Sequence, residues 1–464
     1  MAHSVRTMDG PAWAKKSGRR WTGGLLVAAS LVVAACSSSA ATVVPSAAPT
    51  PVAPTSAATA ALSAAPSQAS APVDLQFWGW VPKEEDAVAA WNAANPNIHV
   101  TFHRMTGDDG SKIPAAIDAG SAPDIIQMGS ADVPSYLINN RLTDISSYLA
   151  DVKASYDATA WSAVSFGNAI YAVPQDAGPS GMVYRSDIFT KYNIAVPKTW
   201  AEYLEAGRKL KAADPKIYLA QLSANEPGFW LQDAWQAGGS FYGTSGNSWT
   251  VNVNGPESKN VAAMWQEALN EGLFKVVDMW TPAYWAEINA GHIATINYLA
   301  WFPGFLAENA PTLSGKWTVA PSPTFAGIDS AGAGGYGVNA VPKGTKHVQE
   351  AVQFMKWLDT SNDGLDFLIT KGGLFPAAVP GLSRPALLSP NAYFGGQEIN
   401  EVFIAAAKKV PSSWTNGPTL SLTLDALKDN FAKVVAGKQT FSQALDLVAE
   451  KERQDLLDAG LSVK

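Results

Sequence analysis

The sequence is poor in cysteine, histidine and charge, and it lacks a long hydrophobic run. One residue of 464 is cysteine and five are histidine, which excludes an internal disulfide framework and a zinc site with several thiolate ligands. Charged residues make up 16%, and a net charge of −7 argues against a nucleic-acid binder, which needs a basic surface. The apolar stretch 23–35 is shorter than the roughly 20 residues that a membrane-spanning helix requires, and later apolar runs are soon interrupted.

Common catalytic signatures are also missing. The sequence contains no GxxxxGK[ST] phosphate loop, no GxSxG elbow, no HExxH and no CxxC motif. His99 and His103 flank an expected strand, where a four-residue spacing aligns ligands less well than on a helix, so we interpret them as surface histidines. Asp108 and Asp109 precede a glycine, but the spaced acidic ligands of an EF-hand are absent. We therefore expect no metal and no cofactor.

The first 35 residues have the pattern of a secretory signal peptide. A basic segment precedes the apolar stretch 23–35, and small residues come directly before Cys36. This arrangement resembles a bacterial lipobox, which implies cleavage before Cys36 and a diacylglyceryl group on its thiol that holds the protein at the membrane surface. The alternatives are an ordinary signal peptide with an incidental cysteine, or a free buried thiol.

The segment that follows Cys36 has the composition of a disordered tether. Residues 37–72 carry no charge, and 31 of these 36 residues are Ala, Ser, Thr or Pro. Such a segment cannot bury enough apolar area to offset its ordering entropy, so we expect 36–72 to be the lipidated cysteine and a disordered linker. The remaining length of roughly 390 residues exceeds one ordinary core and favours two lobes.

Strands and helices are expected to alternate after residue 72, which predicts an α/β protein with a parallel sheet. In open sheets of this kind, ligands bind beyond the carboxyl ends of the strands. Thr199 and Glu202 form a capping-box pattern at the start of an expected helix. The expected strands are 73–78, 98–102 and 124–128, and the expected helices are 84–95, 112–119, 132–139, 199–213, 259–271, 348–358, 363–370, 420–436 and 441–457.

Tryptophan is the residue in surplus, with seventeen in the chain. The apolar C–H faces of a pyranose pack on aromatic rings, and its hydroxyls need polar partners, so a sugar cleft combines Trp and Tyr with acid and amide side chains. We interpret Trp91, Trp200, Trp265 and Trp357, which lie on expected helices, as core residues. Tryptophans in loops are better candidates for a cleft, and Trp78 fits either role.

Short motifs follow one another in a fixed order from residue 73 to the end of the chain. They are LQFWGW, APDIIQM, AIYAVPQDAGPSGMVYRSDIF, PKTWAEYLEAGRKLK, GHIATINYLAW, GGYGVNAVPKGTKHVQEAVQFMKWL, KGGLFPA and VVAGKQTFSQALDLVAEKERQDLL. This order resembles that of the extracellular solute-binding proteins of ABC importers, in the sugar-binding, maltose-binding-protein-like family.

The resemblance implies a two-lobed periplasmic-binding-protein fold with hinge strands and a ligand cleft between the lobes. One lobe would hold 73–176 and 333–383, and the other 177–332 and 384–464. It also implies a monomeric binding protein, not an enzyme, that is anchored by lipid at the cell surface or in the periplasm. This protein would capture a mono- or oligosaccharide by lobe closure and deliver it to an ABC permease.

Eight residues are candidates for ligand binding. Trp80 ends the first strand, at the sheet edge where ligands are expected. Asp132, Asp176 and Glu226 match polar family positions, and Trp301 and Trp414 match stacking positions. The full set is Trp80, Asp132, Asp176, Glu226, Trp230, Trp301, Tyr336 and Trp414.

Several alternatives remain open for these candidates. Asp132 fits a helix N-cap equally well, Glu226 fits a solvated turn acid, and Phe229 competes with Trp230 as its aromatic neighbour. Asp176 and Glu226 would also suit the acid/base pair of a surface-anchored glycoside hydrolase. A third possibility is a binder of the same fold for a non-sugar solute such as a polyamine.

Overall fold

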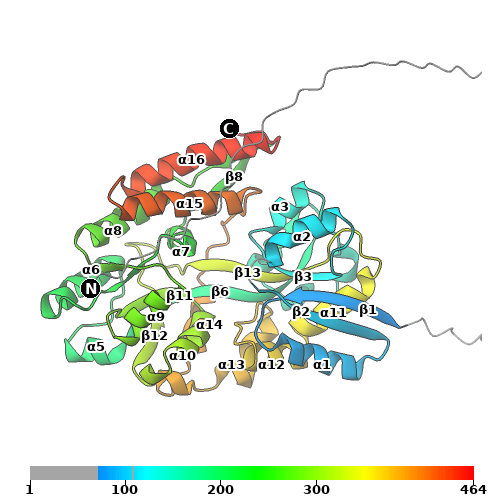
Figure 1. The fold of residues 1–464 in the computed structure, drawn as a ribbon, viewed down its shortest axis with the longest axis horizontal. Coiled ribbons are helices and arrows are strands. Elements are labelled where there is room, and N and C mark those ends of the chain that lie inside the picture. The colour runs from blue at the N-terminus through cyan, green and yellow to red at the C-terminus, as the bar shows by residue number, and fades with distance from the viewer. Residues whose placement is uncertain (1–71, 107–108) are drawn as a thin grey trace, which may run out of the picture. The chain divides into compact units, whose positions relative to one another are not determined.

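The structure is a computed structural model, and it describes residues 72–106 and 109–464 (Figure 1). The predicted signal peptide, the predicted lipidation site Cys36 and the predicted tether up to residue 71 lie outside the described residues, so all three stay predictions. Within the described residues, no helix has the length and apolar character needed to cross a membrane.

The described part begins with three parallel strands, which confirms the predicted alternation of strands and helices. β1 (Val73–Gly79) lies between β2 (Ile98–Arg104) and β3 (Ile125–Gly129). The strands are parallel because, after each of the first two, a helix carries the chain back to the end of the sheet at which that strand began. The helices that follow the three strands are α1 (Glu84–Ala94), α2 (Asp109–Asp118) and α3 (Val133–Ile138).

Hydrophobic side chains cover both faces of this sheet. Ile125 and Ile126 are consecutive on β3, so they point to opposite faces and enter different hydrophobic clusters. The cluster around Ile125 includes Trp91 and the apolar faces of α11 (Val348–Thr360) and α12 (Asn362–Thr370). We call the part of the molecule built around these two clusters the first lobe.

Two strands connect the first lobe to the rest of the molecule. β6 (Ala172–Arg185) pairs antiparallel with β13 (Ala333–Ala340), and β13 pairs with β3. The second half of β6 pairs with β11 (Thr295–Leu299) and β12 (Trp317–Pro321). Figure 1 shows β6 and β13 side by side. One seven-stranded sheet therefore runs through both halves of the molecule.

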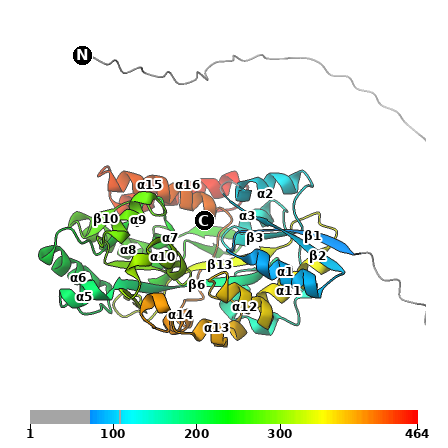
Figure 2. The ribbon, with the colours of Figure 1, turned by 60° about the horizontal axis from the view of Figure 1, so that its bottom comes forward.

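The second lobe is built around the largest hydrophobic cluster of the described residues. Trp200 and Trp265 are buried in this cluster, which confirms their prediction as core residues. Helices α15 and α16 lie side by side in Figures 1 and 2. The helices of this lobe are α5 (Ser186–Lys191), α6 (Trp200–Ala213), α7 (Gly228–Gln236), α8 (Pro256–Asn270), α9 (Pro282–Asn289), α10 (Phe302–Asn309), α13 (Pro385–Leu388), α14 (Ile399–Ala407), α15 (Leu420–Val435) and α16 (Phe441–Asp458).

Short elements complete the fold. A parallel pair and two short antiparallel pairs flank the main sheet. The strands of these pairs are β7 (Ala220–Leu222) with β10 (Phe274–Val276), β4 (Ser165–Phe166) with β5 (Ala169–Ile170), and β8 (Tyr242–Ser245) with β9 (Ser248–Val251). The remaining helices are α4 (Ala158–Ser162) and the 3₁₀ turns Ser146–Tyr148, Lys153–Ser155, Pro311–Leu313, Val379–Ser383 and Ala392–Phe394.

The predicted capping box at α6 forms only in part. The Thr199 hydroxyl accepts a hydrogen bond from the Glu202 backbone N–H, as predicted. The Glu202 carboxylate, however, accepts from the N–H of Lys198, one residue before the N-cap. A complete capping box occurs instead at α16, between Thr440 and Gln443. The pattern thus places the start of α6 correctly, while the reciprocal hydrogen bond is made by the residue before the N-cap.

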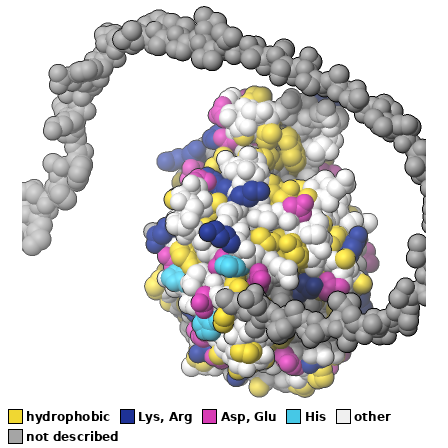
Figure 3. Space-filling view, turned by 90° about the vertical axis from the view of Figure 1, so that its right-hand side faces the viewer, with side chains coloured by type: hydrophobic (Ala, Val, Ile, Leu, Met, Phe, Trp, Pro, Cys, Tyr) yellow, Lys and Arg dark blue, Asp and Glu magenta, His cyan; other side chains and the backbone are white. Residues whose placement is uncertain are grey.

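Charged side chains of both signs are scattered over the face seen in Figure 3, among apolar and uncharged polar side chains. On that face, the described residues form no extended field of a single sign. This face therefore has no continuous basic surface that could bind the phosphate backbone of a nucleic acid.

Candidate functional site

A cavity of about 240 Å³ is lined by residues of both lobes and of β13. Tyr336 and Gly335 of β13 contribute from the strand that connects the lobes. The lining includes three tryptophans and a tyrosine beside hydroxyl and amide groups, which is the combination predicted for a sugar cleft. Its residues are Ser130, Thr159, Ser162, Ala163, Ser165, Phe166, Gly167, Trp235, Trp249, Gly335, Tyr336, Ser412, Trp414, Thr415 and Asn416.

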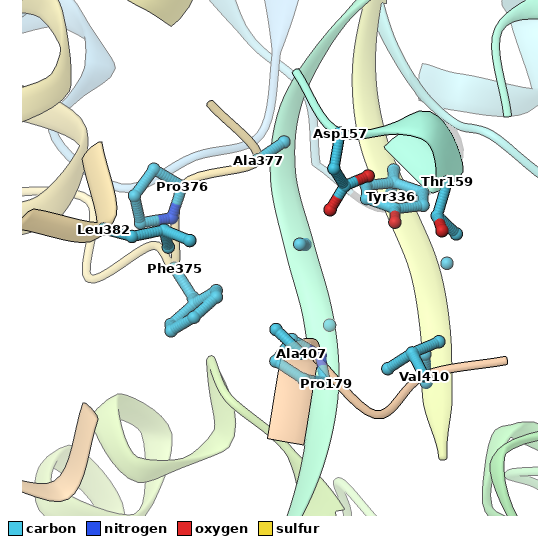
Figure 4. A pocket seen from close by; sticks show the side chains of 14 residues that line it. Asp157, Thr159, Pro179, Tyr336, Phe375, Pro376, Ala377, Leu382, Ala407 and Val410 are labelled. Atoms are coloured by element: carbon cyan, nitrogen blue, oxygen red, sulfur yellow. The ribbon is translucent and has the colours of Figure 1, made fainter. Parts of the chain in front are cut away.

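A smaller cavity of about 30 Å³ shares Tyr336 and Thr159 with the larger one. Figure 4 shows Asp157, Thr159 and Tyr336 on one side of β6, with Phe375 and Pro376 on the other. This volume is enough for one or two water molecules. Tyr336 lines both cavities and lies on β13, one of the two strands that connect the lobes.

Trp414 is held by neighbours on the second lobe. Its ring stacks on Trp235, with the two ring centroids 4.9 Å apart and the planes 16° from parallel. Its indole Nε1 donates to Asn416 Oδ1 at 2.9 Å. Phe241 also packs against the Trp414 ring, with the centroids 4.9 Å apart and the planes at 55°. The structure thus brings two sequence candidates, Trp414 and Tyr336, to the same cavity.

Trp235 was missed by the sequence analysis. It lies near the end of α7, a nine-residue helix that was not predicted because its sequence, GFWLQDAWQ, is uniformly rich in apolar and aromatic residues. The Trp235 indole donates to the carbonyl oxygen of Pro411 at 2.7 Å. This bond ties α7 to the segment that carries Trp414. The short spacing of Trp230 and Trp235 alone did not indicate which of the two faces the cavity.

Trp301 and Glu226 lie in a second aromatic cluster. Trp301 follows β11, and its ring lies 5.9 Å from that of Trp280, with an angle of 27° between the planes. The Trp280 indole Nε1 donates to Glu226 Oε2 at 3.0 Å. Tyr298 packs edge-on against Trp301 at 5.1 Å and stacks on Phe229 at 4.3 Å. Burial, together with the nearby negative charge of Glu226, raises the pKa of the Tyr298 hydroxyl well above its usual value.

Trp280 is a further residue that the sequence analysis missed. It lies in the loop between β10 and α9, and no motif singles it out. The weak signal available was the sequence DMWTP, in which a tryptophan directly precedes a Thr-Pro helix start.

Trp230 is placed in the core, which differs from its prediction as a ligand-binding residue. Its exposed fraction is 0%, and its ring packs on Trp265, Phe431 and Phe441. The physical reason is the phase of α7. Consecutive helical residues point about 100° apart, so with Phe229 turned towards Tyr298, Trp230 turns into the interior.

Asp176 lies where β6 and β13 meet. Its Oδ1 accepts a hydrogen bond from the backbone N–H of Gly337 at 2.6 Å, beside a register shift in the pairing of the two strands. Burial raises the pKa of the Asp176 carboxyl to about 6. The carboxyl therefore joins the two connecting strands.

Asp132 stands at the N-cap of α3, but its side chain makes no capping hydrogen bond in the described part of the chain. The backbone explains this, since the residue has helical dihedral angles (φ −88°, ψ −19°) and not the extended ones that let an N-cap side chain accept from the backbone N–H groups of the first turn. Burial raises the pKa of this carboxyl. Asp132 is not among the residues that line the larger cavity, although Ser130, two residues earlier in the chain, is.

The Trp80 ring is 44% exposed at the end of β1. Its backbone is fixed, because its N–H donates to Gln127 Oε1 at 2.6 Å and its carbonyl accepts from Arg104 at 3.1 Å. Gln127 in turn bonds Gln175, whose amide donates to Glu84 Oε1 at 2.9 Å. A chain of buried amides thus holds the loop that carries Trp80.

Comparison with known families decides the class of protein. Residues 81–362, more than half of the chain, match the family model of the bacterial extracellular solute-binding proteins. The chain belongs to this family. Within the described residues of this solute-binding protein, no group of three or more His, Cys, Asp or Glu side chains could hold a metal ion.

Relatives agree with this assignment. The solute-binding protein is 23% identical over 361 residues to an arabinooligosaccharide-binding protein of Halalkalibacterium halodurans, covering 73% of this chain and 79% of the relative. It is 27% identical to the ABC-transporter-associated binding protein of B. animalis subsp. lactis Bl-04, solved with β-1,6-galactobiose (TM-score 0.76, covering 85% and 100% of the two chains). It is also 27% identical to the galacto-N-biose/lacto-N-biose I-binding protein of Bifidobacterium longum, solved with lacto-N-biose (TM-score 0.77, covering 85% and 99%). The expected fold, an α/β protein with two lobes, is confirmed.

Proposed function

We propose that this solute-binding protein captures a mono- or oligosaccharide outside the cell, closes its lobes on it, and delivers it to the permease of an ABC importer. The observation that carries the proposal is the 240 Å³ cavity, in which Trp414 and Tyr336 stand beside hydroxyl and amide groups from both lobes. Aromatic faces suit the C–H faces of a sugar ring, and the polar groups suit its hydroxyls. Relatives with more than a quarter of their residues identical are solved with disaccharides, which supports the same ligand class.

The proposed ligand contacts divide by chemistry. Trp414, Trp301 and Trp80 offer faces for stacking, and Tyr336 offers a hydroxyl at the connecting strand. Asp132 offers a carboxylate two residues after Ser130 of the cavity lining, and a sugar hydroxyl would restore the hydrogen bonds that this carboxylate loses on burial. Asp176 and Glu226 already accept hydrogen bonds from the protein, so their proposed role includes holding other groups in place.

Closure follows from the placement of these contacts on both lobes. We propose that the first lobe holds 73–176 and 333–383, that the second holds 177–332 and 384–464, and that β6 and β13 act as the hinge. A ligand touching both lobes stabilises the closed arrangement over the open one by the contacts that only the closed arrangement allows. No bond chemistry is needed, and the protein acts as a monomer, without a cofactor. The predicted lipid on Cys36 would keep the protein at the membrane surface, at the cell surface or in the periplasm, near the permease.

The test is a binding screen of the chain from residue 37 against a broad panel of saccharides, by thermal shift and calorimetry. At least one saccharide is expected to raise the melting temperature, and Trp414→Ala is expected to lower its affinity by roughly tenfold or more through loss of a stacking face. Trp357→Ala is the control, because Trp357 packs on the periphery of the first lobe.

Three outcomes would contradict the proposal. The first is a panel in which no saccharide binds while a cationic solute such as a polyamine does. The second is hydrolysis of a saccharide by the wild-type chain, which would make the protein an enzyme. The third is an equal loss of affinity in Trp414→Ala and Trp357→Ala, which would mean that the loss reflects stability and not contact.

A further inference from the structure

We propose that Trp280 is a specificity-determining residue, fixed by Glu226, that selects oligosaccharides over monosaccharides. This inference rests on the proposed function and names the ligand class within it. It follows from four observations: the backbone conformation of Trp280, its bond to Glu226, the exposure of its ring, and the placement of Glu226 and Trp414 near opposite ends of α7.

The backbone of Trp280 is held in an unusual conformation. Its φ angle is +67°, in the left-handed region that bulky residues rarely adopt. Such a conformation costs on the order of 1 kcal/mol or more and persists only when the surroundings impose it. Here the Met279 N–H donates to Ser223 Oγ at 3.1 Å, and Thr281 caps α9 through the Tyr284 N–H at 3.2 Å. Hydrogen bonds of the residues on both sides therefore hold the backbone of Trp280 in this conformation.

A carboxylate then fixes the direction of the ring. Glu226 Oε2 accepts from the Trp280 indole N–H at 3.0 Å, and Glu226 Oε1 accepts from the Gly228 N–H at 3.2 Å. A charged acceptor shared by an indole and a helix N-terminus is a strong anchor. Glu226 is therefore a positioning residue for Trp280.

The Trp280 ring remains open to solvent although four aromatic rings of the described residues pack against it. Trp280 is 37% exposed, and Phe305, edge-on to it at 5.6 Å, is 39% exposed. Trp301 lies beneath Trp280 with its plane 27° away. Exposed aromatic rings that are rigidly held and grouped in this way mark a binding surface. We call Trp280, Trp301 and Phe305 the outer platform.

The outer platform and Trp414 lie at opposite ends of α7. Glu226, which anchors the platform, precedes α7 by two residues, and Trp235, which stacks on Trp414, is its penultimate residue. Nine helical residues span about 13 Å at 1.5 Å each. One pyranose ring is too small to contact both ends, whereas a chain of sugar rings reaches from one to the other. The arrangement therefore favours an oligosaccharide.

The experiment measures affinity against ligand length with the chain from residue 37. Calorimetry is run with a monosaccharide and with progressively longer oligosaccharides of the series that the wild type binds. Trp280→Gly removes the ring and keeps the backbone, because glycine adopts positive φ without strain. It is expected to lower the affinity for the longest ligand by roughly 3- to 10-fold, while the affinity for the shortest stays within twofold of wild type.

Two more variants separate positioning from general damage. Glu226→Gln is expected to reduce the preference for long ligands in the same direction, because the indole loses its charged acceptor. Val276→Ala, an exposed apolar residue on β10 outside the platform, is the matched control and is expected to keep the wild-type length preference. The melting temperature of each variant reports its folding.

The inference is overturned if Trp280→Gly lowers the affinity for ligands of every length equally, or for none of them. It is also overturned if the wild type binds a monosaccharide as tightly as an oligosaccharide. If the wild type binds no saccharide at all, the proposed function itself fails. The two failures are therefore distinguishable in one series of titrations.

Discussion

Glu84 opens α1, yet its side chain points into the first lobe and is only 2% exposed. Oε1 accepts from Gln175, and Oε2 has no hydrogen-bond partner among the described residues. A helix N-terminus favours a negative charge by at most about 1 kcal/mol at an ordinary site. The cost of removing the carboxylate from water is larger than this favourable effect, so burial raises the pKa of Glu84 to about 8.

The raised pKa makes stability depend on pH. Between the ordinary pKa of 4.5 and the folded value of about 8, the unfolded chain releases the proton while the folded chain keeps it. Stability is therefore expected to fall as pH rises through this range. Glu84→Gln removes this titrating group and the pH dependence that comes with it. The difference in free energy of unfolding, variant minus wild type, should therefore be larger at pH 8 than at pH 5, by on the order of 1–3 kcal/mol. Denaturant unfolding at both values measures it.

The neighbouring Glu85 provides the control for this prediction. A hydrogen bond from its own backbone N–H and the Arg104 guanidinium lower the pKa of Glu85. The ionised Glu85 therefore stabilises the fold above pH 4.5, and this contribution is lost as the pH falls below that value. The free energy of unfolding of Glu85→Gln relative to wild type should therefore not rise between pH 5 and pH 8. Parallel pH profiles for wild type and Glu84→Gln would show that Glu84 is ionised in the folded chain.

Single residues are where the sequence was least able to predict the candidate site. The sequence found Trp414 and Tyr336, which the structure places at one cavity, because residue type and loop position suffice for them. It placed Trp230 in the cleft although the phase of α7 turns that ring inward. It missed Trp280, since a positive φ imposed by bonds to Ser223 and Tyr284 leaves no pattern in the sequence.

At the scale of elements, the connecting strands depend on small residues. A Cβ atom on Gly337 would lie 2.1 Å from Asp176 Oδ1, far inside van der Waals contact. Gly337→Ala would displace the carboxyl that joins β6 to β13. We expect a cost of roughly 1–3 kcal/mol, as for overpacking in a core, and a corresponding drop in melting temperature.

Gly304→Ala is the matched control. Gly304 lies within α10, and no heavy atom of the described residues would lie within 4 Å of its new Cβ. Alanine stabilises a helix interior over glycine by about 0.5–1 kcal/mol, so this variant should melt at the same or a higher temperature. If both variants melted alike, the contact with Asp176 would not be a constraint on the hinge.

Elements with a regular pattern were predicted well. The first three strands and α1, α6, α11, α15 and α16 all follow clear alternation or helical periodicity, and the structure has them close to the expected residues. The 14-residue β6 was not predicted as one strand, because Pro174, Gly178 and Pro179 break its pattern. Short helices such as α7, α9 and α10 were missed because they are apolar on several sides.

At the scale of the whole molecule, we propose that a bound ligand closes the two lobes. Closure requires contacts that only the closed arrangement allows, and a ligand in the larger cavity could make them, since Ser130 and Ser162 belong to the first lobe and Trp414 to the second. Binding energy that did not differ between the two arrangements would shift nothing, however tight the binding.

The chain from residue 37 lacks the only cysteine, so two labels can be introduced without interference. Asp86→Cys on α1 and Glu205→Cys on α6 place exposed labels on the two lobes. A saturating saccharide is expected to change the label-to-label distance and, at a hundredfold excess over Kd, to stabilise the fold by about 2.7 kcal/mol. Adding Trp414→Ala should reduce both effects together at a fixed ligand concentration. Stabilisation without a change in distance would mean that the ligand binds to a cleft whose lobes do not move, and the hinge role of β6 and β13 would have to be abandoned.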